Sequence, residues 1–141
     1  MPIARRSVEI RVPPARLMDV ICDFGAYTRF VPDMIESTVL RAADREWTVK
    51  FALSFIRRVE YTLLLRREGD LRLTWSLVEG HFKSNTGSWE LEPLDGGAAT
   101  RATYTLDLDL GMFVPGSVLK TLLEHNLPAM LEAFRVRAEA A

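Results

Sequence analysis

The chain has 141 residues, of which 48% are hydrophobic and 26% are charged, a composition typical of a globular protein and not of a disordered one. Lys and Arg number 18 against 19 Asp and Glu, so the chain lacks the overall basic charge of most nucleic-acid-binding proteins. Its longest uncharged run, between Asp109 and Lys120, is far shorter than the roughly 20 residues of a membrane-spanning helix. We therefore expect one soluble, cytoplasmic domain over residues 1–141, with no DNA partner.

Cysteine and histidine are too scarce for a disulfide framework or a metal site. Cys22 is the only cysteine, and the two histidines, His81 and His125, are far from it in the sequence. A structural zinc site needs four such ligands. We expect no bound metal and no cofactor, and we expect Cys22 to pack in the core.

The N-terminal part predicts a strand followed by two short helices. Over Ile3–Val12 apolar and polar residues alternate, as in a half-buried strand. The pair Pro13–Pro14 ends this pattern and suits the first turn of a helix. Apolar residues then recur at spacings of three and four over Leu17–Phe24. Gly25 breaks that helix, and a second short helix is expected to end at Pro32.

Six further segments alternate in the same way and are separated by short turns, which predicts antiparallel hairpins. One face of these segments is apolar, and the other carries Arg, Glu and Asp. The strands are expected at Met34–Arg41, Glu46–Ile56, Arg58–Arg67, Leu71–Glu79, Lys83–Pro93 and Thr100–Leu110.

A long helix is expected at the C-terminus, from about Pro115 to Glu139. Its apolar stripe includes Leu122 and Met130. Pro128 lies inside this pattern and should kink the helix, because proline removes a backbone donor and clashes with the preceding turn. The predicted fold is α+β, with about seven antiparallel strands whose apolar face wraps on this helix.

Three parts of the sequence match known motifs. Asp23–Pro32 matches D-[FY]-x-x-[YW]-x-x-F-x-P, and Gly80–Trp89 matches G-x-F-x-x-x-x-G-x-W. Together with Phe113–Gly116 and Leu127–Phe134, which resemble a closing helix, they resemble START-like (SRPBCC) domains, in the branch of polyketide cyclase/dehydrase-like and coenzyme Q-binding proteins. The resemblance implies a helix-grip fold, with an internal cavity between the sheet and the helix.

Two asparagines are predicted to face this interior. Asn85 falls on the apolar face of its strand by a period of 2, and Asn126 falls between Leu122 and Met130 by a period of 3.6. Their amides are candidates to bind a ligand oxygen; alternatively, Asn126 satisfies backbone groups freed by Pro128 and Asn85 caps a turn. The candidate ligand-binding residues are Phe51, Tyr61, Trp75, Asn85, Trp89, Tyr104, Phe113, Leu122, Asn126 and Met130.

The sequence assigns no catalytic residue. No carboxylate is expected on an inward-facing run, so a general acid–base pair is not evident. His81 is expected at an exposed turn and His125 on the flank of the helix. Two positions differ from the coenzyme Q-binding relatives, which usually have proline in place of His81 and an aliphatic residue in place of Asn85.

Three functions are compatible with these features. The leading hypothesis is binding or transport of a lipid, quinone or polyketide-like molecule. The alternative is an aromatase/cyclase or dehydratase in which Tyr61, Tyr104 or a histidine transfers protons; a third is a ribosome-associated or protein-binding role. The apolar residues Met112, Phe113 and Val114 either pack as a turn or contact ligand, membrane or protein at the cavity mouth. RNA contact is not expected, because arginines at strand edges usually guard those edges.

Overall fold

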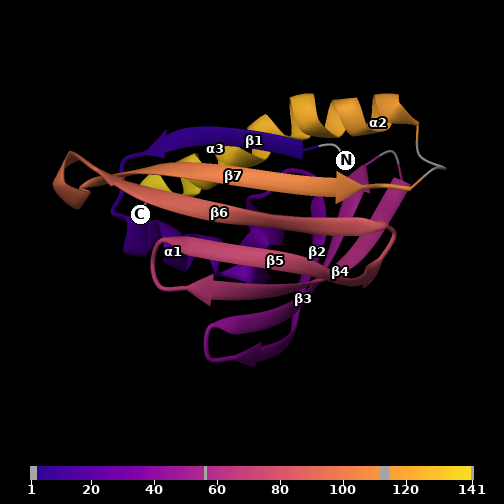
Figure 1. Ribbon diagram of the computed structural model, residues 1–141, viewed down its shortest axis with the longest axis horizontal. Helices are drawn as coiled ribbons and strands as arrows, with labels where there is room; N and C mark the ends of the chain where they lie inside the picture. Colours follow the sequence, from indigo (N-terminus) through magenta and orange to yellow (C-terminus); the bar gives the residue numbers. More distant parts are fainter. Residues whose placement is uncertain (1–2, 56, 112–114, 141) are drawn as a thin grey trace.

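The computed structural model describes residues 3–55, 57–111 and 115–140. Seven strands form one antiparallel sheet in the order β1-β7-β6-β5-β4-β3-β2 (Figure 1). The strands are β1 (Ile3–Ile10), β2 (Met34–Ala43), β3 (Glu46–Phe55), β4 (Arg57–Glu68), β5 (Arg72–Gly80), β6 (Ser84–Leu94) and β7 (Ala99–Asp109). Together with the long C-terminal helix, this sheet confirms the predicted α+β helix-grip fold.

The sheet order follows from short connections. Strands β2 to β7 pair with their neighbours in chain order, and β1 adds to β7 at the far edge. Between β1 and β2 lie α1 (Pro14–Ile21) and the 3-10 helix η1 (Phe24–Arg29). Pro14 occupies the first turn of α1, where its missing N–H costs nothing.

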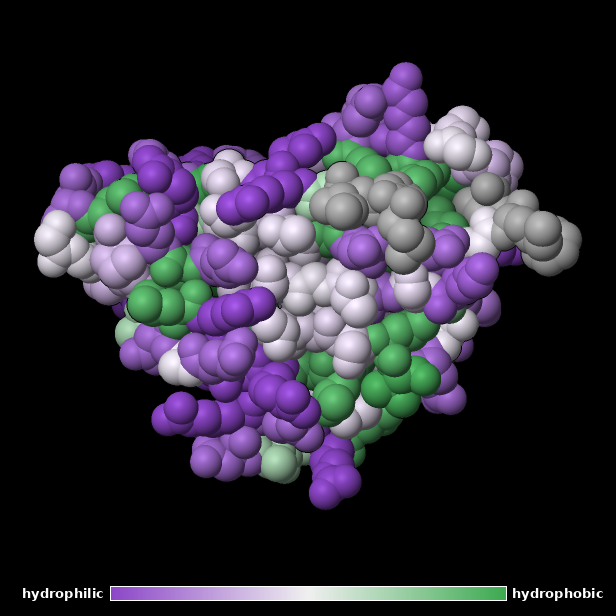
Figure 2. Space-filling view, viewed as in Figure 1, coloured by the Kyte–Doolittle hydropathy of each residue, from purple (hydrophilic) through white to green (hydrophobic). Residues whose placement is uncertain are grey.

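The sheet is bent and has two chemically different faces. Register shifts in β2 and between β4 and β5 mark bulges, which increase local twist and help the strands curl around the helix. The face turned away from the helix is largely polar, with a few separate apolar patches (Figure 2). Leu71, expected as the first residue of a strand, instead precedes β5 in the turn and is 46% exposed.

The C-terminal helix has three parts, namely α2 (Gly116–Thr121), the π-helical turn η3 (Leu122–Asn126) and α3 (Leu127–Glu139). The irregularity expected at Pro128 takes the form of this π turn. The Leu127 N–H donates to the Leu122 carbonyl, one residue further back than in an α-helix. The proline ring would clash with the carbonyl four residues before it in a regular helix, so the wider turn relieves that clash.

The concave face of the sheet, α1 and α3 bury the core. Phe134 of α3 is fully buried and meets the Trp89 ring edge-on, with 5.2 Å between ring centroids. Cys22 is half-buried and packs against this core. Among the described residues, none of the helices has the length and apolar character needed to cross a bilayer.

Candidate functional site

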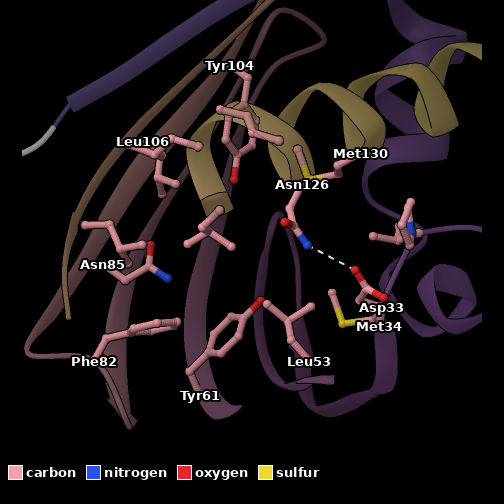
Figure 3. Close-up of a pocket in the computed structure, with 16 residues that line it drawn as sticks. Asp33, Met34, Leu53, Tyr61, Phe82, Asn85, Tyr104, Leu106, Asn126 and Met130 are labelled. Atoms are coloured by element: carbon pink, nitrogen blue, oxygen red, sulfur yellow. Dashed lines mark hydrogen bonds between the residues drawn. The ribbon is translucent and has the colours of Figure 1, made fainter. Parts of the chain in front are cut away.

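A cavity of about 100 Å³ lies between the concave face of the sheet and the C-terminal helix (Figure 3). The strands, the segment after η1 and the π turn all contribute to its wall. The lining residues are Val31, Pro32, Asp33, Met34, Leu53, Tyr61, Phe82, Asn85, Tyr104, Leu106, Leu108, Leu122, Leu123, Asn126, Leu127 and Met130. An apolar wall with a few polar groups is typical of small-molecule sites.

A second cavity of about 70 Å³ adjoins the first. Its wall is mainly aromatic and includes Phe51, Trp75 and Trp89. Five residues line both cavities and so form the boundary between them: Val31, Met34, Tyr61, Tyr104 and Met130.

The structure brings nine of the ten candidate residues to these two cavities. The first cavity alone is lined by Asn85, Leu122 and Asn126. The second alone is lined by Phe51, Trp75 and Trp89. Both are lined by Tyr61, Tyr104 and Met130. The tenth candidate, Phe113, lies outside the described residues with Met112 and Val114. The expected apolar lip at the cavity mouth therefore stays a prediction, as does a ligand-binding role for the other nine.

Asn85 is held in one orientation by Trp75. Asn85 is 6% exposed, and its Oδ1 accepts a hydrogen bond from the Trp75 indole at 3.1 Å. An indole N–H only donates, so the amide oxygen must face it. The amide nitrogen is then left to point into the cavity (Figure 3). Asn85 lies in β6 and its side chain bonds to the Trp75 indole, so the alternative that Asn85 caps a turn is wrong.

Gly87 makes the position of Trp75 possible. The two residues are paired across β5 and β6. A Cβ at Gly87 would lie 2.3 Å from the Trp75 ring and 2.4 Å from the Thr105 carbonyl oxygen. Only glycine leaves enough room for the indole to lie against β6 and reach Asn85.

The hydroxyls of Tyr61 and Tyr104 point into the cavity (Figure 3). Tyr61 stacks on Phe51, with 5.5 Å between centroids, and Tyr104 meets Trp89 edge-on at 5.0 Å. Burial raises the pKa of both phenols well above the usual value, so both remain protonated at neutral pH. Neither hydroxyl bonds to a described residue, whereas the Tyr27 hydroxyl donates to the Ile21 carbonyl.

Asp33 is a cavity residue that sequence analysis missed. The expectation that no carboxylate lies on an inward-facing run did not consider turns, and Asp33 lines the cavity from an exposed position in a turn. Its Oδ2 accepts a hydrogen bond from Asn126 Nδ2 at 3.0 Å. Asp33 lies in the turn between η1 and β2, where no strand or helix period predicts direction. Its φ of +64° is left-handed backbone, which aspartate adopts more readily than most residues. Asn126 therefore bonds to this turn, and within the described part of the chain its side chain makes no bond to backbone groups near Pro128.

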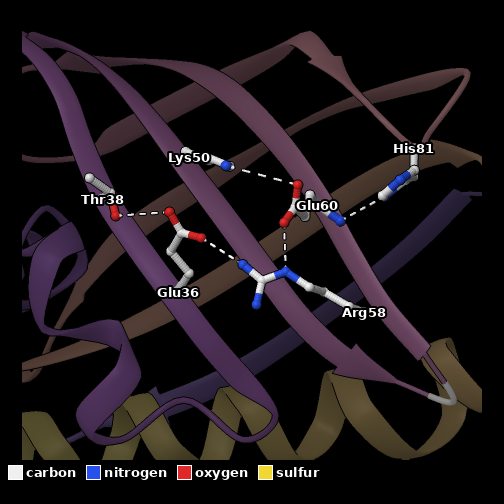
Figure 4. Close-up of polar contacts among 6 residues, drawn as sticks. All are labelled: Glu36, Thr38, Lys50, Arg58, Glu60 and His81. Carbon is white, nitrogen blue, oxygen red and sulfur yellow. Dashed lines mark hydrogen bonds and ion pairs between the residues drawn. The ribbon is translucent and has the colours of Figure 1, made fainter.

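Neither histidine lines the cavities. His81 is exposed, as expected, and its Nδ1 accepts the backbone N–H of Glu60 at 2.8 Å (Figure 4). The Glu60 carboxylate accepts a hydrogen bond from Arg58 at 2.5 Å, which lowers the pKa of Glu60, and pairs with Lys50 at 3.8 Å. These side chains lie on the outer face of the sheet, so a histidine proton donor is not found at the cavity. In the parts of the chain that the structure describes, no three His, Cys, Asp or Glu side chains group as metal ligands.

A sheet wrapped on a helix around an apolar cavity is the helix-grip architecture that the sequence predicted. Residues 10–135 match the family described as polyketide cyclase / dehydrase and lipid transport. The chain belongs to this family, which confirms the resemblance found in the sequence. Membership of the coenzyme Q-binding branch stays a prediction.

Individual relatives are distant. The chain is 26% identical over 145 residues to the persistence and stress-resistance toxin PasT of Escherichia coli O6:H1, covering 99% of this chain and 88% of that protein. The Zhui aromatase/cyclase from Streptomyces sp. R1128 superposes with a TM-score of 0.87 and 17% identity, over 98% of this chain and 93% of that one. A START superfamily protein from Mycobacterium smegmatis superposes with a TM-score of 0.86 and 20% sequence identity, over 98% of this chain and 97% of that one. The two solved structures share the fold with this chain.

Proposed function

We propose that the protein binds a hydrophobic small molecule, of lipid, quinone or polyketide-like type, in the space between the sheet and the C-terminal helix. One observation carries this proposal. The hydroxyls of Tyr61 and Tyr104 point into an apolar cavity without a partner among the described residues. Polar groups on the wall of an apolar cavity bond to whatever occupies that cavity, so these hydroxyls are suited to bind a polar group of a ligand.

Because the cavities are small, we expect their walls to move when a ligand binds. Cavities of about 100 and 70 Å³ are smaller than the roughly 300–1,000 Å³ of sites for drug-sized ligands. Met34 and Met130 lie on the boundary of both cavities, and unbranched methionine side chains change rotamer easily. Rotation of these two side chains would join the two cavities into one elongated site.

An aromatase/cyclase or dehydratase activity is a second candidate, and Asp33 favours it. Among the described residues that line the two cavities, Asp33 is the only one with a carboxylate. It would act as the base, while the protonated Tyr61 and Tyr104 polarise a carbonyl. One oxygen of the Asp33 carboxylate is already bonded to Asn126 at the cavity mouth. We therefore rank ligand binding above an enzymatic activity. The ribosome-associated or protein-binding role stays a prediction.

An apolar probe tests the proposed function. We expect 2-isopropenylnaphthalene to bind with one-to-one stoichiometry in an NMR titration of the ¹⁵N-labelled protein, with shifts confined to residues around the cavities. Met130→Trp should fill the boundary and abolish binding. Val136→Trp is the matched control, because Val136 lies on the same helix but is 53% exposed, and it should bind as the wild type does. Unchanged binding by Met130→Trp would overturn the proposal.

A further inference from the structure

We infer that the cavity selects ligands with a neutral carbonyl oxygen, which is bound by the Asn85 amide together with the hydroxyls of Tyr61 and Tyr104. This inference rests on the proposed function and adds a chemical class to it. The three groups come from different strands, β4, β6 and β7, and point into one cavity (Figure 3).

Asn85 offers the cavity a donor and no acceptor. An amide side chain usually presents either end, because rotation by half a turn exchanges oxygen and nitrogen. Here the indole N–H at 3.1 Å fixes the oxygen, and Gly87 keeps the indole in place. The nitrogen is therefore the end that a ligand meets.

The two hydroxyls reinforce this donor character. Each hydroxyl points into the cavity and can donate its proton to a ligand there (Figure 3), and a ligand that leaves such a donor unpaired binds at a cost. The strongest acceptor in the wall, the Asp33 carboxylate, lies at the mouth and is bonded to Asn126. A ligand group that accepts several hydrogen bonds meets this need, and a carbonyl oxygen has two lone pairs for the purpose.

The charge of the cavity wall decides whether a ketone or a carboxylate is the better ligand. Among the described residues that line the two cavities, none is Arg or Lys. A buried carboxylate without a cationic partner is strongly disfavoured. The site is thus suited to an uncharged carbonyl compound, such as a ketone or quinone, more than to the carboxylate of a free fatty acid.

Three naphthalene probes of similar shape test this selectivity: 2-acetylnaphthalene, 2-isopropenylnaphthalene and 2-naphthoate. The wild type should bind the ketone at least about tenfold more tightly than the hydrocarbon, since donors left unpaired penalise the latter, and should bind the carboxylate more weakly than the ketone. Asn85→Leu, Tyr61→Phe and Tyr104→Phe should each reduce the preference for the ketone. Thr86→Val, on the exposed side of the same strand, is the matched control and should keep it.

The outcomes separate this inference from the proposed function. Equal affinity for ketone and hydrocarbon in the wild type, or an unchanged preference in all three variants, overturns the inference and leaves the proposed function standing. No binding of any probe to the wild type overturns the proposed function as well. If Asn85→Leu does not fold, the two Phe variants decide. In all cases the carbonyl stretch of ¹³C-labelled 2-acetylnaphthalene should move to lower frequency when bound to the wild type, and less so in the Phe variants.

Discussion

The Trp75 indole and the Asn85 amide meet across β5 and β6, with 3.1 Å between Nε1 and Oδ1. Trp75 is paired with Gly87 of β6. Its ring lies across that strand and reaches Asn85, which precedes Gly87 by two residues. The contact satisfies both the indole N–H and the amide oxygen inside the core. It also leaves the amide nitrogen as the polar group that a ligand would encounter.

The close approach at Gly87 predicts a loss of stability on adding one methyl group. Gly87→Ala would place a Cβ 2.3 Å from the Trp75 ring, so the ring or the strand must shift. Overpacking of this kind typically costs about 1–3 kcal/mol. Urea denaturation should show this loss in the free energy of unfolding.

Gly25→Ala is the control for that experiment. Gly25 lies in η1, its φ is not positive, and no atom lies within 4 Å of the place that an added methyl group would take. This variant should be neutral or more stable by up to about 1 kcal/mol, because alanine restricts the unfolded chain. Equal stability of the Gly87→Ala and Gly25→Ala variants would contradict the packing of Trp75 against β6.

Periodicity predicted the fold and most of the candidate site. Asn85 and Asn126 were placed inward by periods of 2 and 3.6, and both line the cavity. Asn85 lies in a strand, and Asn126 still faces inward although it ends the π turn. Asp33 was missed because it lies in a turn with a φ of +64°, where no period applies. The bond between Trp75 and Asn85 depends on the register of β5 against β6, which alternation within one strand does not specify.

The three tyrosines should respond differently to loss of the hydroxyl. Tyr27→Phe removes a donor to the buried Ile21 carbonyl and should lower the free energy of unfolding by about 1 kcal/mol. Tyr61→Phe and Tyr104→Phe remove hydroxyls without a described partner and should leave stability unchanged or raise it. Thermal unfolding of the three variants measures the difference. If Tyr61→Phe or Tyr104→Phe lost as much stability as Tyr27→Phe, the cavity hydroxyls would be shown to stabilise the fold.

Alkaline pH should destabilise the protein through the same three residues. Burial raises the pKa of Tyr27, Tyr61 and Tyr104 above the usual value of 10.0. A raised pKa in the folded state means that the stabilisation is fully present below about pH 10 and is lost as the pH rises above it, because the unfolded chain releases these protons first. Urea midpoints measured between about pH 9 and 11.5 should fall, and less steeply in a Tyr61→Phe/Tyr104→Phe double variant. Phenolate absorbance that appears near pH 10 before any unfolding would contradict the burial of these phenols.

The bond between Asp33 and Asn126 should control how fast a ligand enters and leaves. It joins the turn before β2 to the π turn at the cavity mouth. Asn126→Leu removes this link while keeping a side chain of similar size, so exchange of 2-isopropenylnaphthalene should accelerate severalfold. Because the hydrocarbon makes no hydrogen bond, its affinity should change little. NMR line shapes give both quantities, and an unchanged exchange rate would show that the bond does not restrain the mouth.

Intermolecular NOEs test the location of the binding site most directly. With ¹³C-labelled methyl groups, bound 2-isopropenylnaphthalene should show NOEs to Leu106, Leu122 and Met130, which line the cavity. It should show none to the exposed Leu40 and Val78. NOEs to the exposed methyl groups, with none to the three cavity residues, would contradict the proposal that this protein binds its ligand between the sheet and the C-terminal helix.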